Sequence, residues 1–280
     1  MEQRRTPRGW HLHHHEQLFF KASAGAPTLR IKFYHYPSYR QEVHLDHTPP
    51  EWKLRSKGNN TFFLFQKKVQ TKGMLSFERT VTVFPTPYSL PSSDIWGRIS
   101  DIPKALQQKY QQSYPYWPTN SRLIQDVAGE RWFSTDNLSE WVRAVSTYII
   151  TKIKYAEEQD KRLGADEALT TGTGDCDEFT DVLMTFARIR GIPCRRLTGY
   201  HITKEGKDIE PHAWAELFSP QIGWIPVDLA LHTIGHHTVS YVIKKIEEFT
   251  PSLLDFQAKS LSRAVQYHWE TPLPLVTPVY

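Results

Sequence analysis

A cysteine flanked by glycines and acids stands at the start of an apolar helical pattern, in TGTGDCDEFTDVL at 171–183. Asp175 fits a helix N-cap, and Glu178 completes a D-x-x-E variant of the capping box. Cys176 would then be the first helical residue, where unpaired N–H groups and the helix dipole favour a thiolate over a thiol. A thiolate is a nucleophile, but the commoner fate of a lone cysteine is to be a small buried hydrophobic residue.

The helix terminus alone does not make this cysteine reactive. A terminus contributes about 0.3–1 kcal/mol, whereas one pKa unit is about 1.4 kcal/mol, so the dipole lowers a thiol pKa of about 8.5 by less than one unit. The carboxylates of Asp175, Asp177 and Glu178 act in the opposite direction. A reactive Cys176 therefore requires a cationic partner, and an imidazolium is the expected one.

Two strand-like segments downstream supply such a partner. In PHAWAELF the alternation of period two places His212 and Trp214 on one face, and in GWIPVDLA it places Trp224 and Asp228 on one face. The link SPQIG lets these strands fold back on each other, which brings His212 close to Asp228. With Cys176 they form a nucleophile, its base and the group that orients the base. The two tryptophans are candidate groove walls, but core positions are commoner for such residues.

Each member of this set also has an ordinary structural explanation. A histidine in a strand is usually a hydrogen-bonded polar group, and an aspartate at a strand end usually caps a turn. The hypothesis of a site therefore depends on all three residues meeting.

The elements around these residues predict an α+β fold. From 28 to 90, the runs TLRIKFYHY, NNTFFLFQKKVQ and MLSFERTVTVF predict a small antiparallel β domain. An Ig-like sandwich is the form we expect, with a hairpin at TKG. Residues 91–121 read as a linker with a short helix in DIPKALQQKYQQ. From 122 to 280, LSEWVRAVSTYIITKIKY predicts an amphipathic helix, and helices precede strands in what we interpret as the catalytic domain. Gly191 is expected to end the helix of Cys176.

The first 27 residues contain HLHHHE at 11–16 and a stretch of small residues. Metal capture by these histidines is one interpretation. A flexible, tag-like segment is the preferred one, because no neighbouring residue would fix the ligand geometry.

The composition excludes several classes of protein. The net charge is +4, and the short basic clusters, Arg4-Arg5, Lys67-Lys68, Arg195-Arg196 and Lys244-Lys245, are interpreted as solvated pairs rather than a nucleic-acid footprint. No apolar stretch suits a membrane span or a signal peptide, so we expect a cytoplasmic protein without a membrane partner. Two cysteines cannot form a disulfide scaffold or a four-cysteine zinc site.

Three blocks of the sequence resemble a known family. GDCDEFTDVLMTFARIRGIPCRRLTGY, HAWAELFSPQIGW and IPVDLA, within residues 122–235, resemble the transglutaminase-like superfamily, including its archaeal and bacterial branch of cysteine protease candidates. The resemblance implies a papain-like core with Cys176 on a central helix, packed against a sheet that carries His212 and Asp228.

The departures from the family pattern are local. Family members often have alanine at the position of Cys194, which implies a packing substitution, and Asp228-Leu229 stands where D-P is commoner. The zinc-binding cysteine pairs of the glycan-removing branch are absent from the sequence.

The expected function is that of a thiol-dependent amide-bond enzyme, either a cysteine protease or amidase or a protein-glutamine acyl transferase. Its intermediate would be a thioester on Cys176, its substrate a protein or peptide amide, and no cofactor or metal would be required. The backbone N–H of Cys176 is a candidate oxyanion donor. The alternative is a non-catalytic transglutaminase-like module that binds protein.

Overall fold

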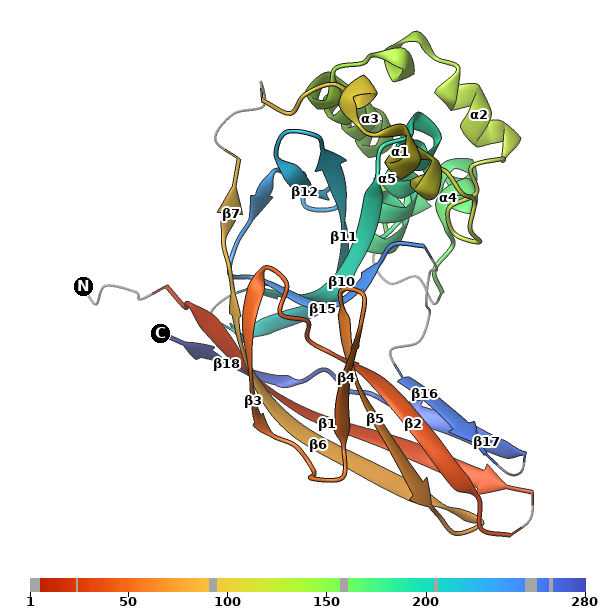
Figure 1. Ribbon diagram of the computed structural model, residues 1–280, viewed down its shortest axis with the longest axis vertical. Helices are drawn as coiled ribbons and strands as arrows, with labels where there is room; N and C mark the ends of the chain where they lie inside the picture. The colour runs from red at the N-terminus through yellow and green to blue at the C-terminus, as the bar shows by residue number, and fades with distance from the viewer. Residues whose placement is uncertain are drawn as a thin grey trace.

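The computed structural model describes residues 6–23, 25–90, 95–156, 161–203, 206–249, 256–261 and 264–280. These residues form two domains, which lie one above the other in Figure 1. We call them the β-sandwich domain, built from both ends of the chain, and the α+β domain, built from the middle. Among the described residues, no helix is long and apolar enough to cross a membrane.

The β-sandwich domain consists of two antiparallel sheets. One has the strand order β17-β1-β6-β3, with β18 also paired to β1, and the other has the order β16-β2-β5-β4. The strands are β1 (Gly9–Ala22), β2 (Thr28–His35), β3 (Gln41–His47), β4 (Lys53–Lys57), β5 (Asn60–Lys68), β6 (Lys72–Pro85), β16 (Phe256–Ser260), β17 (Val265–Glu270) and β18 (Leu275–Val279). Aromatic side chains from both sheets fill the space between them, including Phe20, Phe33, Phe63, Phe65 and Phe77.

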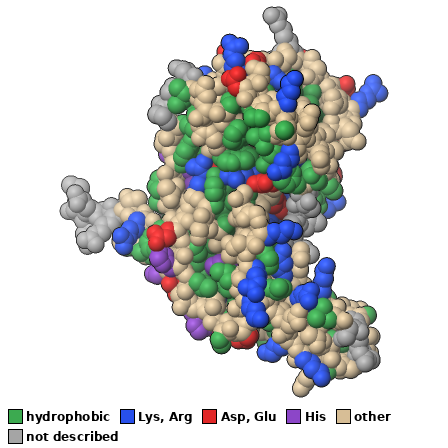
Figure 2. Space-filling model, in the orientation of Figure 1, with side chains coloured by type: hydrophobic (Ala, Val, Ile, Leu, Met, Phe, Trp, Pro, Cys, Tyr) green, Lys and Arg blue, Asp and Glu red, His purple; other side chains and the backbone are tan. Residues whose placement is uncertain are grey.

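The prediction that residues 1–27 form a flexible segment is wrong for Gly9–Ala22, which is the central strand β1. In HLHHHE, Leu12, His14 and Glu16 are buried while the alternate histidines face outward. Figure 2 shows histidine side chains at the surface of this domain. The inward polar groups have partners, because the His14 ring bonds the Tyr36 hydroxyl at 2.7 Å and Arg79 pairs with Glu16 at 2.9 Å. The run HLHHHE is therefore part of an ordinary β-strand, in which inward-facing and outward-facing residues alternate.

The boundaries predicted for the domains also differ from those observed. Strand β16 pairs with β2, and β17 and β18 pair with β1, so these three C-terminal strands belong to the β-sandwich domain rather than to the catalytic one. The α+β domain is therefore inserted into the sandwich between β6 and β16. The expected hairpin at TKG is wrong, because β5 and β6 lie in different sheets and pair with different strands. A short link between two strand patterns does not distinguish a hairpin from a crossing between sheets.

The α+β domain packs helices against one face of an antiparallel sheet, which confirms the predicted α+β class. The sheet order is β13-β12-β11-β10-β15. The elements are β7 (Tyr88–Ser89), α1 (Lys104–Tyr110), α2 (Arg122–Ala128), α3 (Leu138–Lys152), β8 (Lys154–Tyr155), α4 (Ala165–Thr171), β9 (Thr173–Gly174), α5 (Cys176–Arg190), β10 (Cys194–Thr203), β11 (Asp208–Ser219), β12 (Gly223–Asp228), β13 (Thr233–Ile234), β14 (His236–His237) and β15 (Tyr241–Glu247), with 3-10 turns at Ile99–Asp101 and Arg131–Ser134.

Helix α5 is the centre of this domain. Its apolar side chains, such as Phe179, Leu183 and Phe186, share one core with α3 and with the near face of the sheet. Gly191 ends the helix with φ 77°, as expected. The short helix expected in the segment 91–121 is α1, but Trp96 and Trp117 lie in the same core. The described part of that segment is therefore a piece of the domain and not a linker.

The two domains are joined at β15, an edge strand of the α+β sheet. The Gln41 amide pairs with both backbone groups of Ile243, at 2.7 and 2.9 Å. The Asn60 amide does the same to Ile246, at 2.6 and 2.8 Å. These side chains satisfy backbone groups that an open edge would expose. An apolar cluster that includes residues of both domains completes the junction.

Candidate active site

The N-terminus of α5 has the cap that the sequence predicts. The Asp175 carboxylate accepts from the Asp177 N–H at 2.8 Å, and the Glu178 carboxylate accepts from the Asp175 N–H at 3.0 Å. Gly174 is needed before the cap, since a Cβ there would lie 2.3 Å from the Glu178 Cβ. Cys176 is the first residue of the helix and is partly exposed.

The ring of His212 and the carboxylate of Asp228 meet in a buried hydrogen bond. His212 Nε2 lies 2.7 Å from Asp228 Oδ2, and both side chains are largely buried. The register pairs Ala215 with Val227, which puts Asp228 diagonally across from His212 rather than directly opposite. His212 and Asp228 are therefore close to each other, as the alternation predicts, but as diagonal neighbours on adjacent strands.

Further hydrogen bonds fix the Asp228 carboxylate. The Tyr241 hydroxyl donates to Oδ2 at 2.9 Å, and the Leu231 N–H donates to Oδ1 at 3.1 Å. Burial alone would raise the pKa of Asp228, but the hydrogen bond and charge of His212, with these two donors, hold it below its usual value. Asp228 is therefore an ionised acceptor at neutral pH.

Strand β11 brings Cys176 to the neighbourhood of this pair. The N–H of Ala213, the residue after His212, donates to the Cys176 sulfur. One turn further along α5, the Thr180 hydroxyl donates to the Ala213 carbonyl at 3.2 Å. Both backbone groups of Ala213 thus dock the start of α5 onto the strand that carries His212.

The surroundings of the Cys176 sulfur disfavour a thiolate. Burial raises the pKa of the thiol well above its ordinary value, and the charges of Asp177 and Asp175 raise it further, while the Ala213 N–H and Arg196 lower it. The sulfur and a carboxylate oxygen of each aspartate lie within 4.8 Å of one another. The acids thus raise the thiol pKa against the effect of the helix dipole, as the sequence predicts. These surroundings therefore favour the thiol form of Cys176 over the thiolate.

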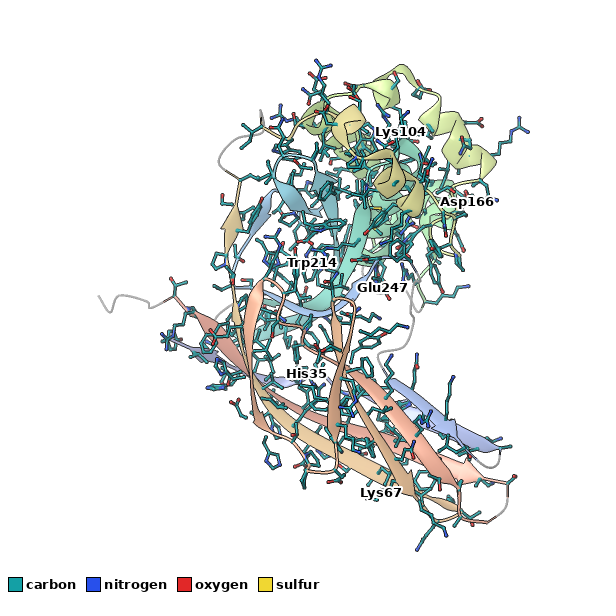
Figure 3. The ribbon with its side chains drawn as sticks, viewed as in Figure 1. His35, Lys67, Lys104, Asp166, Trp214 and Glu247 are labelled. Carbon is teal, nitrogen blue, oxygen red and sulfur yellow. The ribbon has the colours of Figure 1, made fainter. Side chains whose placement is uncertain are left out.

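Aromatic and imidazole rings surround His212. Trp214 stacks on it with ring centroids 5.9 Å apart, and Figure 3 shows Trp214 inside the α+β domain. Trp214 is 1% exposed, so its interpretation as a core residue is correct. The rings of His201 and Tyr241 lie 5.6 and 6.1 Å from that of His212. Sequence reasoning missed Tyr241 and His201, because strand order and register, which bring them here, left no signal in the sequence.

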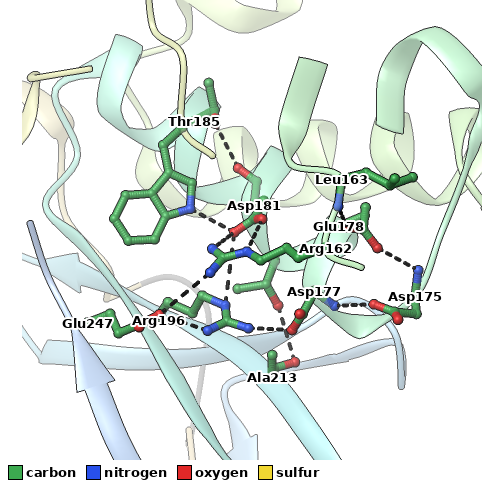
Figure 4. A network of polar contacts seen from close by, with 12 residues as sticks. Arg162, Leu163, Asp175, Asp177, Glu178, Asp181, Thr185, Arg196, Ala213 and Glu247 are labelled. Atoms are coloured by element: carbon green, nitrogen blue, oxygen red, sulfur yellow. Dashed lines mark hydrogen bonds and ion pairs between the residues drawn. The ribbon is translucent and has the colours of Figure 1, made fainter. Parts of the chain in front are cut away.

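The interpretation of two basic clusters as solvated pairs is wrong. Arg195, Arg196, Lys244 and Lys245 are all at least 90% buried. Arg195 pairs with Glu216 at 2.7 Å, and the partners of Arg196 are drawn in Figure 4. Both faces of β10 are covered, so charged side chains on it are buried and must be paired.

The described residues contain one group whose donor atoms could hold a metal ion, namely Asp175, Cys176 and Asp177. The N-terminal histidines do not form such a group. Because this group includes the candidate nucleophile, it does not separate metal chemistry from thiol chemistry, and the expectation of a metal-free site stays a prediction.

Comparisons with known proteins agree with this architecture. Residues 127–229 match the transglutaminase-like superfamily. The structure resembles that of a candidate cysteine protease from Cytophaga hutchinsonii, with 16% identity, a TM-score of 0.62, and coverage of 97% of this chain and 94% of that one. The periplasmic domain of TgpA from Pseudomonas aeruginosa, bound to ethylmercury, is less similar, with 15% identity, a TM-score of 0.40, and coverage of 82% and 92%. No curated protein matches the sequence.

The predicted family resemblance is thereby confirmed. The α+β domain carries a transglutaminase-like core in residues 127–229, preceded by antiparallel β-sheets. The likeness to the Cytophaga hutchinsonii protein spans nearly the whole of both chains, so the β-sandwich domain is included in the shared fold.

Proposed function

We propose that this protein is a thiol-dependent amide-bond enzyme that acts through Cys176, His212 and Asp228. The observation that carries the proposal is the buried 2.7 Å hydrogen bond between His212 and Asp228, one residue from the amide that contacts the Cys176 sulfur. A nucleophile, a base and an orienting carboxylate are the three groups that covalent acyl transfer requires.

The hydrogen bonds assign the roles of the two ring nitrogens. Asp228 is ionised and can only accept, so the proton of neutral His212 is held on Nε2. Nδ1 then carries the free lone pair and is the atom that accepts a proton from Cys176. Because the surroundings keep the sulfur protonated at rest, His212 acts as a general base during attack and not as half of a permanent ion pair.

The reaction proceeds in two stages. As the sulfur attacks the carbonyl carbon of an amide, His212 Nδ1 takes the thiol proton; it then gives this proton to the departing amine, and a thioester remains on Cys176. In the second stage, water or a primary amine attacks the thioester and loses a proton to His212, while the sulfur leaves and regains it. Water makes the protein a hydrolase, and an amine makes it an acyl transferase.

The start of α5 provides a donor for the oxyanion. The Asp175 carboxylate takes the N–H groups of Asp177 and Glu178, and the Asp175 carbonyl takes that of Phe179. Among the backbone N–H groups of the first turn, this cap does not use that of Cys176, which belongs to the nucleophile itself. It would stabilise negative charge on the carbonyl oxygen during attack.

The substrate we propose is a protein or peptide amide. The test is incubation of the protein with a mixed peptide library, with and without a primary amine, read by mass spectrometry. Cleaved peptides identify a hydrolase, and a mass increase equal to the amine less ammonia identifies transfer at glutamine. Cys176→Ala should abolish either product, and Cys194→Ala, the matched control, should retain it.

The absence of both products from the intact protein, or their persistence in Cys176→Ala, would contradict the proposal. The non-catalytic protein-binding module would then be the better interpretation. The cytoplasmic location stays a prediction.

A further inference from the structure

Two carboxylates surround the sulfur of Cys176 at short range. One oxygen of Asp175 and one of Asp177 lie within 4.8 Å of the sulfur and of each other. Asp175 is occupied as the helix cap, with its carboxylate on backbone N–H groups. Asp177 contributes no such bond to the cap, so its negative charge must be balanced by another group.

That group is Arg196, which reaches α5 from β10. Its guanidinium forms a hydrogen-bonded ion pair with Asp177 through Nη2 and a second one with Glu247 through Nη1, at 2.7 Å. The Arg196 side chain is 5% exposed and that of Asp177 is 31% exposed. A buried guanidinium with two carboxylates is fixed in position, and the low dielectric of the interior makes its charge effective.

The ion pair belongs to a larger group of charged side chains, and Figure 4 draws Arg162, Asp181 and Glu247 beside Asp177 and Arg196. Arg162 pairs with Asp181 at 2.5 Å, and Lys245 pairs with Glu247 at 3.1 Å. Among the described residues, Asp177, Asp181 and Glu247 thus pair with Arg196, Arg162 and Lys245, and Arg162 also lies 3.9 Å from Glu247. Removing the charges of Asp177 and Arg196 together leaves the net charge of this region unchanged, whereas removing one of them changes it by one unit.

We propose that Arg196 is a positioning residue for the nucleophile: by holding and neutralising Asp177, it sets how readily Cys176 loses its proton. Arg196 touches neither the sulfur nor a substrate, and it acts through the carboxylate beside the sulfur. The inference rests on the proposed role of Cys176 as nucleophile, but it can be measured without any substrate.

The test is the rate of iodoacetamide alkylation of Cys176 as a function of pH, with the modified peptide identified by mass spectrometry. Asp177→Asn removes a carboxylate beside the sulfur and leaves the positive charge of Arg196 without that partner, so its rate profile should move to lower pH. Arg196→Gln exposes the sulfur to an unpaired Asp177, so its profile should move to higher pH. Each shift should be about one unit, which is on the order of a tenfold change in rate at fixed pH.

The double variant Asp177→Asn with Arg196→Gln distinguishes this role from a purely structural one. Because it restores the balance of charge, its profile should return to within a few tenths of a unit of the unmodified protein. A structural role predicts instead that the double variant is disturbed at least as much as either single one. Lys245→Gln is the matched control, since it removes a cation of the same network whose pair is Glu247 and should shift the profile less than Arg196→Gln.

Two results would overturn the proposal: an Asp177→Asn profile that does not move to lower pH, or a double variant that does not return toward the original. Arg196→Gln leaves buried acids without a cation and is the variant at risk of misfolding. The proposal is therefore decided by Asp177→Asn and by the double variant. Failure of the proposed enzyme function is a separate result. It would appear as an absence of turnover in the unmodified protein, whereas the alkylation rates of the variants are measured without any substrate.

Discussion

Substitution of Asp228 by asparagine separates the orienting role of this residue from its structural one. The carboxylate accepts from Leu231 N–H on Oδ1 and from His212 and Tyr241 on Oδ2. An amide must place an NH2 group on one side. The Leu231 N–H cannot change its character, whereas the imidazole can change tautomer and the hydroxyl can rotate. The amide oxygen should therefore face Leu231 and its NH2 group should face His212.

This orientation inverts the chemistry of the ring. Nε2 of His212 must then accept, so Nδ1 carries the proton and cannot take one from Cys176. The expected loss of turnover is about 10⁴-fold, which is about 5 kcal/mol of transition-state stabilisation. Turnover of the best substrate from the peptide library, compared between Asp228→Asn and the unmodified protein, measures it.

The fold should survive, with a defined dependence on pH. The pKa of Asp228 is lowered in the folded state, so its ionised form stabilises the protein above the unfolded value of about 3.9, and this contribution is lost as the pH falls through the lower folded value. Thermal unfolding should therefore show a deficit in Asp228→Asn at pH 7 that shrinks at acid pH. A folded variant with undiminished turnover would refute the reasoning and leave Asp228 as a turn cap.

Further predictions concern neighbours of the site. Tyr241→Phe removes one hydrogen bond to the orienting carboxylate, worth roughly 1.5–3 kcal/mol, so turnover should fall about ten- to a hundredfold while the fold persists. Gly199→Ala places a Cβ 1.8 Å from a backbone oxygen of the neighbouring strand, so the unfolding temperature should fall, and an unchanged one would contradict the geometry. Iodoacetamide should modify Cys176 well before the fully buried Cys194, as peptide mass spectrometry would report. A chelator should leave turnover unchanged, and recovery of a lost activity by zinc would remove the triad assignment.

The local parts of the site could be predicted from the sequence, because local rules govern them. The cap of α5 depends on neighbouring residues, and the approach of His212 to Asp228 depends on one short turn and the alternation of a strand. Tyr241 could not be found in this way. It reaches Asp228 only because β15 lies beside β10 in the sheet, an order that hydrophobic periodicity does not encode.

The errors in the β-sandwich domain have a related cause. Strand β1 pairs with β17 and β18 at the other end of the chain, and β2 pairs with β16, so no local pattern could assign these C-terminal strands to the β-sandwich domain. The buried Arg195 and Arg196 were misinterpreted because charge predicts exposure only when the backbone lies at the surface. On a strand covered on both faces, pairing with an acid replaces solvent, and the acid is distant in the sequence.

The β-sandwich domain also contributes to the geometry of the site. Gln41 holds both backbone groups of Ile243, two residues from Tyr241 on the same strand. Tyr241 in turn donates to Asp228, which orients His212. An edge strand without these bonds would be free to fray, and its tyrosine would lose a fixed position. The two amide contacts on β15 therefore link the inserted α+β domain to its host through the same strand that supports the proposed base.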